Sequence, residues 1–338
     1  MDAPDTEAIP VTGGRARTVV IGASHWHVPL YAPAIAEVHD VVGLSDEDPE
    51  RVSSLGDVWG APVVSDWRDL LTVPDVELAY VFGPHDRMAE VCLALIDRRI
   101  PFVAEKPLGV SLAELQEVRR AAAEAGVPAT VALVQRGGPV DAWLARAGRP
   151  VYQRYSFVAG PPERYERNGN PWMLDPVRAG GGCLANLGPH FVDLFLQRSG
   201  ATTGAVTGRL ATALHAAAVE DHATVVVSTP DGREAIIEVA YAFPDSPRKR
   251  YCSYSSAGEH GFASIDSEGS ATFTALDGTT ERAVLDVDSD PLYALFVRQV
   301  AGALGDGFRG LPTLGDLEQA MRIVWRSYEA HRTEAHHG

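Results

Sequence analysis

Residues 17–27 read RTVVIGASHWH, and this stretch decides the fold that the sequence predicts. The run from 17 to 22 is rich in β-branched residues and ends in Gly22, which is typical of a buried parallel strand followed by a tight turn. Residues 28–38 then carry the pattern of a helix. A strand, a glycine turn and a helix in this order are typical of the first unit of a parallel α/β sheet.

The same alternation continues through the first half of the chain. Residues 111–125 form the clearest helix, because Ser111 is a good N-cap, Glu114 completes a capping box and Gly126 follows the last turn. Strands that alternate with helices in this way predict a doubly wound parallel sheet, the Rossmann arrangement. The further predicted strands are 40–45, 61–64, 78–82, 102–104 and 129–134, and the further helical segments are 66–71 and 87–98.

The second half of the chain has a different pattern. Strand-like runs follow one another directly, and the sequences PDG at 230–232 and LDG at 276–278 are typical of hairpin turns. We expect an α+β domain with a mostly antiparallel sheet and helices at 186–198, 290–304 and 314–330, the last of which packs back on the body. The predicted strands are 151–158, 204–213, 223–229, 234–243, 249–255, 260–265 and 271–275.

Three regions follow from these patterns. Residues 1–16 are polar and aperiodic, and we expect them to form a flexible tail. Residues 17–136 are predicted to be a dinucleotide-binding Rossmann domain, and residues 137–338 an α+β domain. The predicted fold class is therefore α/β, with an N-terminal doubly wound parallel sheet and a C-terminal α+β domain built on a mostly antiparallel sheet.

Charge and composition exclude several classes of partner. The 338 residues include 29 Lys and Arg against 45 Asp and Glu, which gives a formal net charge of −16. This balance argues against binding to nucleic acid, which needs a basic surface, and against docking on an anionic membrane. No apolar run reaches the roughly 18 residues that cross a bilayer, and the N-terminus lacks a signal-peptide pattern. The three cysteines are widely spaced, so we expect a cytoplasmic protein without disulfides.

The turn after the first strand has part of a dinucleotide fingerprint. In the pattern G-x-G-x-x-G, Gly22 holds the first position, Ser24 the second and His27 the third. Asp46 stands at the tip of the next predicted strand, where a carboxylate accepts hydrogen bonds from the adenosine ribose and repels a 2′-phosphate. These residues predict NAD as the cofactor rather than NADP. The open alternative is a plain βα turn with an acid that caps the following helix.

His25 and His27 flank Trp26 in this turn. A zinc site needs a third protein ligand, and none follows nearby, so we expect no metal. The three side chains are expected to line the cofactor crevice, and a purely structural role is the alternative.

Lys106 follows the predicted strand 102–104, at the carboxyl end of a parallel strand where open α/β sheets bind ligands. A lysine held in a crevice loses its proton more readily than a free one, and Glu105 beside it can set its position and charge. The sequence therefore offers Lys106 as a proton-transferring group, although an isolated Glu-Lys-Pro sequence is also typical of a surface turn.

Asn186, His190 and Asp193 recur on one face of the predicted helix 186–198. We expect Asp193 to orient the imidazole of His190, which would then serve as a general base with a pKa near the working pH. The alternative is a helix in which His190 is a buried structural residue.

Together these segments resemble the Gfo/Idh/MocA family of nicotinamide-dependent oxidoreductases over residues 17–330. Residues 104–108 (AEKPL) are similar to its EKP motif, and residues 180–193 (GGGCLANLGPHFVD) to its GGGxLxDxGxHxxD motif, with Asn186 in place of Asp. The resemblance implies a Rossmann domain that carries NAD(P) and a second domain that supplies the substrate pocket. It also implies that subunits associate through the open face of the second sheet.

The resemblance further implies roles for particular residues. Lys106 would transfer the proton, His190 would contact the substrate as an acid/base, and Asn186 would complete the catalytic set. The expected cofactor contacts are Gly22, Ser24, His25, Trp26, His27, Asp46, Gly83, Pro84, His85, Arg87, Glu105 and Lys106. The expected substrate contacts are Tyr165, Arg167, Asn168, Trp172, Asn186, His190 and Asp193.

The function that this predicts is hydride transfer between NAD and a carbinol or keto carbon of a sugar, nucleotide sugar or cyclic polyol. One alternative is an enzyme that holds NAD tightly and catalyses elimination, epimerisation or glycoside cleavage. Another is a non-catalytic protein that binds a sugar or dinucleotide and regulates a partner, which the altered turn at 22–27 and Asn186 would favour. The expected partners are a small-molecule substrate and further copies of the chain, as a homodimer or homotetramer.

Overall fold

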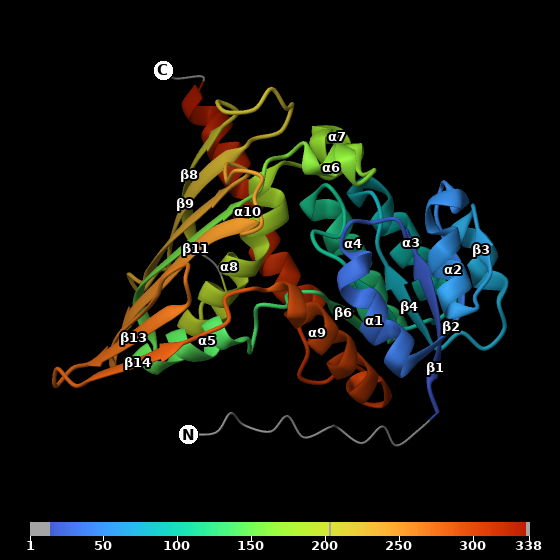
Figure 1. Cartoon of the computed structure of the whole chain (residues 1–338), viewed down its shortest axis with the longest axis horizontal. Coiled ribbons are helices and arrows are strands. Elements are labelled where there is room, and N and C mark those ends of the chain that lie inside the picture. Colours follow the sequence, from blue (N-terminus) through green and yellow to red (C-terminus); the bar gives the residue numbers. More distant parts are fainter. Residues whose placement is uncertain (1–13, 203, 336–338) are drawn as a thin grey trace.

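The computed structural model of the chain describes residues 14–202 and 204–335, so residues 1–13 of the predicted tail lie outside the described part. Two β-sheets with helices between them build the molecule (Figure 1). One sheet is parallel and uses strands between residues 16 and 131, and the other is mostly antiparallel and uses strands between residues 150 and 284. The predicted fold class is therefore confirmed.

The first sheet has six parallel strands in the order β3-β2-β1-β4-β5-β6, as in doubly wound dinucleotide-binding folds. The direction of winding reverses between β1 and β4, and ligands bind at the carboxyl ends of strands at such a point. The strands are β1 (Ala16–Ile21), β2 (His39–Ser45), β3 (Val63–Val64), β4 (Leu78–Val81), β5 (Phe102–Ala104) and β6 (Ala129–Val131).

Helices cover both faces of this sheet. Successive side chains of a strand point to opposite faces, so its consecutive apolar residues pack against helices on both sides. Val19 and Ile21 of β1 belong to the apolar core that α3 and α4 cover, whereas Val20 belongs to the core that α1 covers. The helical segments are α1 (Val28–Val38), η1 (Pro49–Val52), α2 (Ser53–Trp59), η2 (Trp67–Thr72), α3 (His85–Asp97) and α4 (Leu112–Ala125).

The helix α4 begins and ends as the sequence predicts. Ser111 Oγ accepts a hydrogen bond from Glu114 N at 3.3 Å, and Glu114 Oε2 accepts one from Val110 N at 2.8 Å. Gly126 follows the last turn with a φ of 65°, a left-handed conformation that glycine adopts without strain.

The second sheet has eight strands in the order β14-β13-β12-β11-β7-β10-β9-β8. β7 and β10 run parallel, and the other pairs that the structure describes are antiparallel. β14 is not predicted from the sequence, because its residues are mostly polar and exposed. The strands are β7 (Pro150–Ala159), β8 (Ala205–Ala211), β9 (His222–Ser228), β10 (Glu234–Ala240), β11 (Arg250–Gly258), β12 (Gly261–Ile265), β13 (Ser270–Ala275) and β14 (Thr280–Val284).

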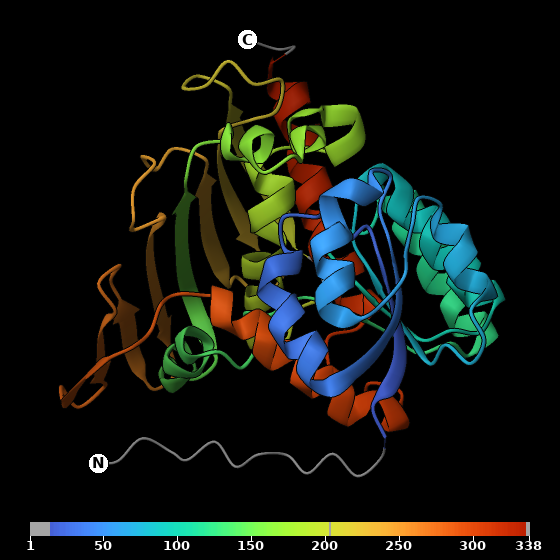
Figure 2. The same cartoon turned by 45° about the vertical axis from the view of Figure 1, so that its right-hand side comes forward.

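Two long helices, α8 (Cys183–Ser199) and α10 (Leu314–Ala335), lie between the sheets, and both pack on the inner face of the second sheet (Figures 1 and 2). α10 also contacts α4, so the last predicted helix packs back on the body as expected. The outer face of the second sheet carries no helix in the part of the chain that the structure describes. The shorter segments are α5 (Pro139–Leu144), η3 (Ala145–Ala147), α6 (Arg164–Arg167), η4 (Pro171–Leu174), α7 (Pro176–Ala179) and η5 (Leu304–Asp306).

The helix α9 (Asp290–Ala303) follows the second sheet in the chain but packs on α1 of the first. Tyr293 and Val297 of α9 are buried in one apolar core with Tyr31 and Ile35 of α1. Residues from both ends of the chain therefore meet beside the carboxyl end of β1. Among the described helices, none is both long enough and apolar enough to cross a membrane.

Candidate active site

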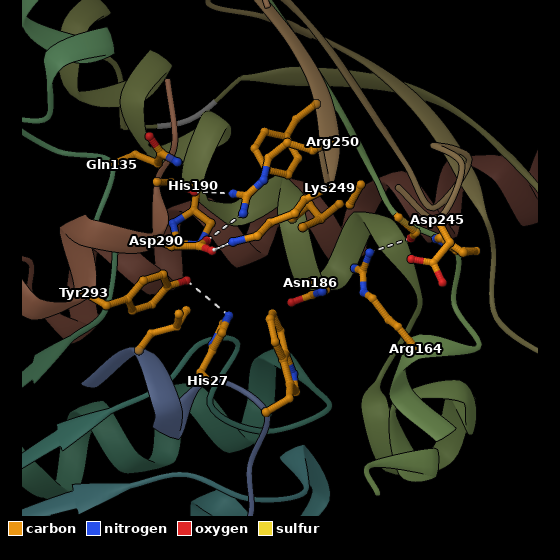
Figure 3. A pocket seen from close by; sticks show the side chains of 18 of the residues that line it. His27, Gln135, Arg164, Asn186, His190, Asp245, Lys249, Arg250, Asp290 and Tyr293 are labelled. Atoms are coloured by element: carbon orange, nitrogen blue, oxygen red, sulfur yellow. Dashed lines mark hydrogen bonds and ion pairs between the residues drawn. The ribbon is translucent and has the colours of Figure 1, made fainter. Parts of the chain in front are cut away.

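A cavity of about 340 Å³, which we call the main cavity, lies where the strand ends of the first sheet face α8 (Figure 3). Trp26 and His27 come from the turn after β1, Lys106 follows β5, and Asn186 and His190 lie on α8. The inner face of the second sheet and the start of α9 complete its wall. Arg167 of α6 also lines it, so six predicted site residues from four separate segments meet in one cavity.

Lys106 is buried and held in one orientation. Its Nζ donates hydrogen bonds to the Asn186 carbonyl oxygen at 2.7 Å and to Asn186 Oδ1 at 2.8 Å. Burial lowers the pKa of Lys106 to about 8, and the charge of Glu105 opposes this shift. In the neutral amine the two N–H groups serve the two Asn186 oxygens, so the lone pair is left for a group in the cavity.

The side-chain amide of Asn186 is fixed from both ends. Its Nδ2 donates to the hydroxyl oxygens of Tyr165 at 2.7 Å and Tyr241 at 3.0 Å, which leaves Oδ1 directed at Lys106. The amide thus offers Lys106 an acceptor without a negative charge. A carboxylate at this position would form an ion pair with Lys106 and raise its pKa.

The glycine-rich loop before α8 sets the position of Asn186. Glu220 accepts hydrogen bonds from Gly182 N at 2.8 Å and from Leu184 N at 2.9 Å, and so caps the start of the helix. A Cβ atom at Gly181 would lie 2.2 Å from the Tyr328 hydroxyl oxygen. Glycine is therefore required for the close packing of this loop on α10.

His190 lies one helical turn after Asn186 and lines the same cavity. Burial lowers its pKa well below the ordinary value, and the charge of Lys106 lowers it further. The imidazole is therefore neutral at neutral pH, and the expectation of a pKa near the working pH is wrong. Its Nδ1 has no hydrogen-bond partner among the described residues.

The predicted contact between Asp193 and His190 is also wrong. Asp193 Oδ2 accepts a hydrogen bond from Arg136 Nε at 2.7 Å, and its other oxygen contacts the same guanidinium group. A two-point ion pair with a guanidinium is stronger than a hydrogen bond to a neutral imidazole, so the carboxylate turns to Arg136.

Glu105 accepts three hydrogen bonds in a buried network beside Lys106. Its Oε1 accepts from His27 Nδ1 at 3.0 Å and from the Tyr31 hydroxyl at 2.5 Å, and its Oε2 accepts from Lys106 N at 3.1 Å. The Tyr293 hydroxyl lies 3.2 Å from His27 Nε2. Because His27 Nδ1 donates to Glu105, Nε2 is the acceptor for Tyr293. The network therefore fixes the tautomer of His27 at the wall of the cavity.

A second cavity of about 460 Å³, the dinucleotide crevice, lies at the reversal point between β1 and β4. A Cβ atom at Gly22 would lie 2.6 Å from the Phe82 carbonyl oxygen, so the close approach of the two turns requires glycine. An open glycine turn with a carboxylate at the end of β2 fits a dinucleotide. Five predicted cofactor contacts line this crevice: Gly22, Asp46, Gly83, Pro84 and Arg87.

Asp46 is held at the edge of this crevice by backbone groups. Its Oδ2 accepts a hydrogen bond from Ser24 N at 2.8 Å, and its Oδ1 accepts one from Asp48 N at 3.2 Å. The carboxylate is therefore fixed where the ribose of NAD is expected. Ser24 N is correspondingly turned toward Asp46, which makes the turn differ from a standard glycine fingerprint.

Other predicted contacts lie behind the cavity walls. His25 and His85 are buried, and burial lowers the pKa of both, that of His85 to about 4. His85 Nδ1 donates to the Ala179 carbonyl oxygen at 2.7 Å. The ring of Trp172 packs against both imidazoles, with centroid distances of 5.7 Å to His25 and 4.9 Å to His85. These three residues join the two domains beneath the cofactor turn.

Residues 164–170 of the second domain pack over the turn after β1. Asn170 Nδ2 donates to the Ser24 carbonyl oxygen at 3.1 Å, and the Asn168 carbonyl oxygen accepts from Arg51 at 3.3 Å. Asn168 lies at a separate surface hollow, outside the main cavity, whereas Arg167 lines the main cavity. Tyr165 is buried behind Asn186.

Several residues of the main cavity are not predicted from the sequence. Arg164, Lys249, Arg250 and Tyr293 all line it. Lys249 offers a sequence signal, since it is one of only two lysines in the chain. The others come from segments whose approach to α8 depends on long-range packing, so no local pattern predicts them.

Within residues 14–202 and 204–335, no group of three or more His, Cys, Asp and Glu side chains is placed to hold a metal ion. Cys92, Cys183 and Cys252 are buried free thiols.

A doubly wound sheet with a dinucleotide crevice, joined to a second domain that carries a separate cavity, is the arrangement of a two-domain protein of the dinucleotide-binding class. Sequence comparison agrees: residues 16–133 match the family described as "Oxidoreductase family, NAD-binding Rossmann fold", and residues 145–261 match the "GFO/IDH/MocA C-terminal domain". The chain belongs to the Gfo/Idh/MocA family, and its first domain is an NAD-binding Rossmann domain.

Curated relatives of the chain include sugar dehydrogenases and reductases. D-apiose dehydrogenase of Rhizobium rhizogenes is 25% identical over 216 residues, which are 60% of this chain and 59% of the relative. 1,5-anhydro-D-fructose reductase of Ensifer adhaerens is 27% identical over 161 residues, 46% of this chain and 47% of the relative. The chain thus spans about half to six-tenths of the length of these relatives.

Solved structures match nearly the whole chain. Levoglucosan dehydrogenase in complex with NADH and levoglucosan has a TM-score of 0.82 at 17% identity, over 95% of this chain and 98% of that chain. An oxidoreductase from Agrobacterium radiobacter in complex with NAD+, L-tartaric acid and magnesium has a TM-score of 0.81 at 17% identity, over 94% of this chain and 96% of that chain. At this identity the similarity shows the shared fold.

Proposed function

We propose that this chain is an NAD-dependent dehydrogenase or reductase that acts on a hydroxyl-bearing or keto carbon of a sugar or cyclic polyol, and that Lys106 carries the proton. When bound, NAD supplies the hydride acceptor or donor. The observation that carries the proposal is the placement of Lys106 Nζ on two Asn186 oxygens, in a cavity whose wall includes the turn that also forms the dinucleotide crevice. The names of the curated relatives support the sugar class.

Lys106 acts as a general base in the direction of oxidation. Its neutral amine keeps both N–H groups on Asn186 and accepts the substrate hydroxyl proton on its lone pair. In the direction of reduction the ammonium group returns a proton to the forming alkoxide. A pKa of about 8 keeps both protonation states accessible near neutral pH, which is what efficient general acid–base catalysis requires.

His190 holds the reacting hydroxyl toward Lys106. Burial keeps the imidazole neutral, so it donates or accepts a hydrogen bond rather than carrying charge. The imidazole lines the main cavity, where it can form such a bond, whereas its Nδ1 is buried without a partner among the described residues. We therefore assign proton transfer to Lys106 and substrate orientation to His190.

We further propose that copies of the chain associate through the outer face of the second sheet, as a homodimer or homotetramer. Tyr251 and Phe262 on this face are 41% and 45% exposed, so both side chains can pack against a second copy. The variant Phe262→Glu should shift the sedimentation coefficient to that of the monomer; an unchanged coefficient would contradict the interface. The buried free thiols support a reducing, cytoplasmic location.

Calorimetric titration with NAD+, NADH, NADP+ and NADPH tests the proposed function. We expect binding of NAD(H), with NADP(H) at least about tenfold weaker because of Asp46. A panel of sugars and cyclic polyols is then followed by nicotinamide absorbance. Failure of all four dinucleotides to bind contradicts the proposal. NAD retained through purification, with product formed but no net NADH, would instead favour an enzyme that recycles its cofactor.

A further inference from the structure

The main cavity gathers positive charge in an acidic chain. The only two lysines of the sequence, Lys106 and Lys249, both line it. Three arginines line it as well, Arg164, Arg167 and Arg250. Two carboxylates, Asp245 and Asp290, are the acidic groups in its lining. Five basic and two acidic side chains thus surround this cavity, although the whole chain carries a net charge of −16.

The two carboxylates are already engaged. Asp290 pairs with both Lys249, at 3.0 Å from Nζ, and Arg250, at 2.6 Å from a guanidinium nitrogen. Asp245 pairs with Arg167 at 2.8 Å. Asp290 is therefore shared by two cations (Figure 3), and Arg250 also pairs with Asp288 at 3.3 Å. The five basic groups of the lining still outnumber the three carboxylates that pair with them.

No carboxylate pairs with Arg164 among the described residues. Its guanidinium donates to the Gly160 carbonyl oxygen and to the Tyr165 hydroxyl, the latter at 2.8 Å. It also packs on the rings of Tyr165 and Tyr241, at 4.7 and 5.1 Å from their centroids. A guanidinium has five N–H donors, so three remain for an anion after these two hydrogen bonds. A mostly buried cation without a counter-ion is unfavourable until an anion reaches it.

The backbone conformation before β11 directs the side chains of Lys249 and Arg250 to the same carboxylate, Asp290. Neighbouring residues of a strand normally point to opposite faces. Lys249 has a φ of 61°, a left-handed conformation that is uncommon for any residue except glycine. This conformation lets Lys249 and Arg250 reach the same carboxylate of Asp290 at the cavity wall.

We propose that the substrate carries an anionic group, a carboxylate or a phosphate, that Arg164 binds directly and that Lys249 and Arg250 attract. The inference rests on the proposed function, because it places this group in the cavity that holds Lys106. Hydrogen bonds of 2.7–2.8 Å link Lys106 to Asn186, Asn186 to Tyr165 and Tyr165 to Arg164. The short chain of contacts allows one small molecule to present its hydroxyl to Lys106 and its acidic group to Arg164.

Calorimetry on the full chain saturated with NADH tests this inference. The probes are D-glucose, D-glucuronate, D-galacturonate, D-glucose 6-phosphate and inorganic phosphate, at constant ionic strength. We expect at least one anionic probe to bind at least about tenfold more tightly than D-glucose, the size of one lost charge-assisted hydrogen bond. The comparison of uronates with the phosphates distinguishes the two chemical sources of the anion. Equal or weaker binding of all anions would overturn the inference.

Four variants sharpen the result. Arg164→Met should lower the affinity for the anionic probe at least about tenfold. Arg164→Lys should restore part of that affinity because it keeps the positive charge. Arg120→Met is the matched control, since Arg120 is exposed on α4 and pairs with Glu124. Unchanged anion binding in Arg164→Met would overturn the role of Arg164. Lys249→Met is an independent test if Arg164→Met fails to fold, and it should also lower the affinity for the anionic probe.

The same titrations separate this inference from the proposed function. If NADH binds but anions show no preference, the anionic substrate is wrong and the dehydrogenase remains. If NADH fails to bind, the anion titrations are run on the chain alone; anion binding that Arg164→Met weakens would then leave the anion site standing while the dehydrogenase is wrong.

Discussion

Lys106 Nζ lies 2.8 Å from Asn186 Oδ1, so the buried lysine is bound by a neutral amide rather than by a carboxylate. Tyr165 and Tyr241 hold the opposite side of that amide and prevent it from turning. Among the described residues Glu105 is the anion that acts on Lys106, and Lys106 keeps the lowered pKa that burial produces. The choice of amide at this position therefore sets the pH range in which the lysine is a base.

The variant Asn186→Asp should move that range upward. A carboxylate next to Lys106 stabilises the ammonium form and raises its pKa above about 8. Oxidation needs the neutral amine, so the rising limb of kcat against pH should move to higher pH by about one unit or more. The measurement is the pH profile of NADH formation. A limb that stays in place would show that Lys106 is not the base.

The ion pair of Arg136 with Asp193 should carry much of the local stability. Burial raises the pKa of Asp193 to about 6, and Arg136 opposes this shift. Removal of the guanidinium in Arg136→Met leaves a buried carboxylate without its main partner, at a cost of about 3–5 kcal/mol. We expect this loss in urea denaturation at pH 8.

The same variant has a signed pH dependence. Without Arg136 the folded-state pKa of Asp193 rises further, whereas the unfolded value stays near about 3.9. Between these values the folded state holds a proton that the unfolded state releases, so stability falls as pH rises through this window. The loss in Arg136→Met should therefore be smaller at pH 5 than at pH 8. Equal losses at the two pH values would contradict this assignment.

Tyr31→Phe should destabilise the fold by about 1.5–3 kcal/mol, because its hydroxyl donates to the buried carboxylate of Glu105 at 2.5 Å. Tyr80→Phe is the matched control. The Tyr80 hydroxyl is also buried but lies 3.0 Å from His39 Nε2, and burial keeps that histidine neutral, with a pKa of about 4. Tyr80→Phe should therefore lower the free energy of unfolding by only about 0.5–1.5 kcal/mol. Thermal or urea unfolding compares the two, and a larger loss in Tyr80→Phe would argue against a charged Glu105.

Asp46→Asn should reduce the preference for NAD+. The amide keeps an acceptor for Ser24 N but loses the charge that repels a 2′-phosphate. We expect the ratio of the NADP+ and NAD+ dissociation constants to fall by about tenfold or more, since a single unfavourable charge contact is worth over about 1 kcal/mol. Calorimetry of both dinucleotides measures the ratio. No change would mean that Asp46 does not face the ribose.

The local patterns of the sequence predict most of the fold. β1, α1 and α4 depend on residues that are close in the sequence. Gly22 marks the turn between β1 and α1, and Ser111 and Gly126 mark the two ends of α4. β14 is not predicted because it is a short polar edge strand, and among the described strands it pairs with β13 alone.

The candidate site is predictable where a motif carries it and not elsewhere. Lys106, Asn186 and His190 belong to recognisable segments and meet in the structure as expected. The predicted contact between Asp193 and His190 is wrong because Asp193 pairs instead with Arg136, which lies 57 positions away in the sequence. Arg164 and Tyr293 reach the cavity through the packing of α6 and α9, which depends on contacts between distant parts of the chain.

The most direct measurement is the activity of Lys106→Met on a substrate from the sugar and polyol panel, with NADH affinity measured on the same preparation. The proposed function predicts that kcat/KM falls by about 10²–10⁴-fold, the usual contribution of a general acid–base group, while NADH binds as in the unmodified protein. Turnover within about tenfold of the unmodified protein, with NADH still bound, would contradict the assignment of proton transfer to Lys106.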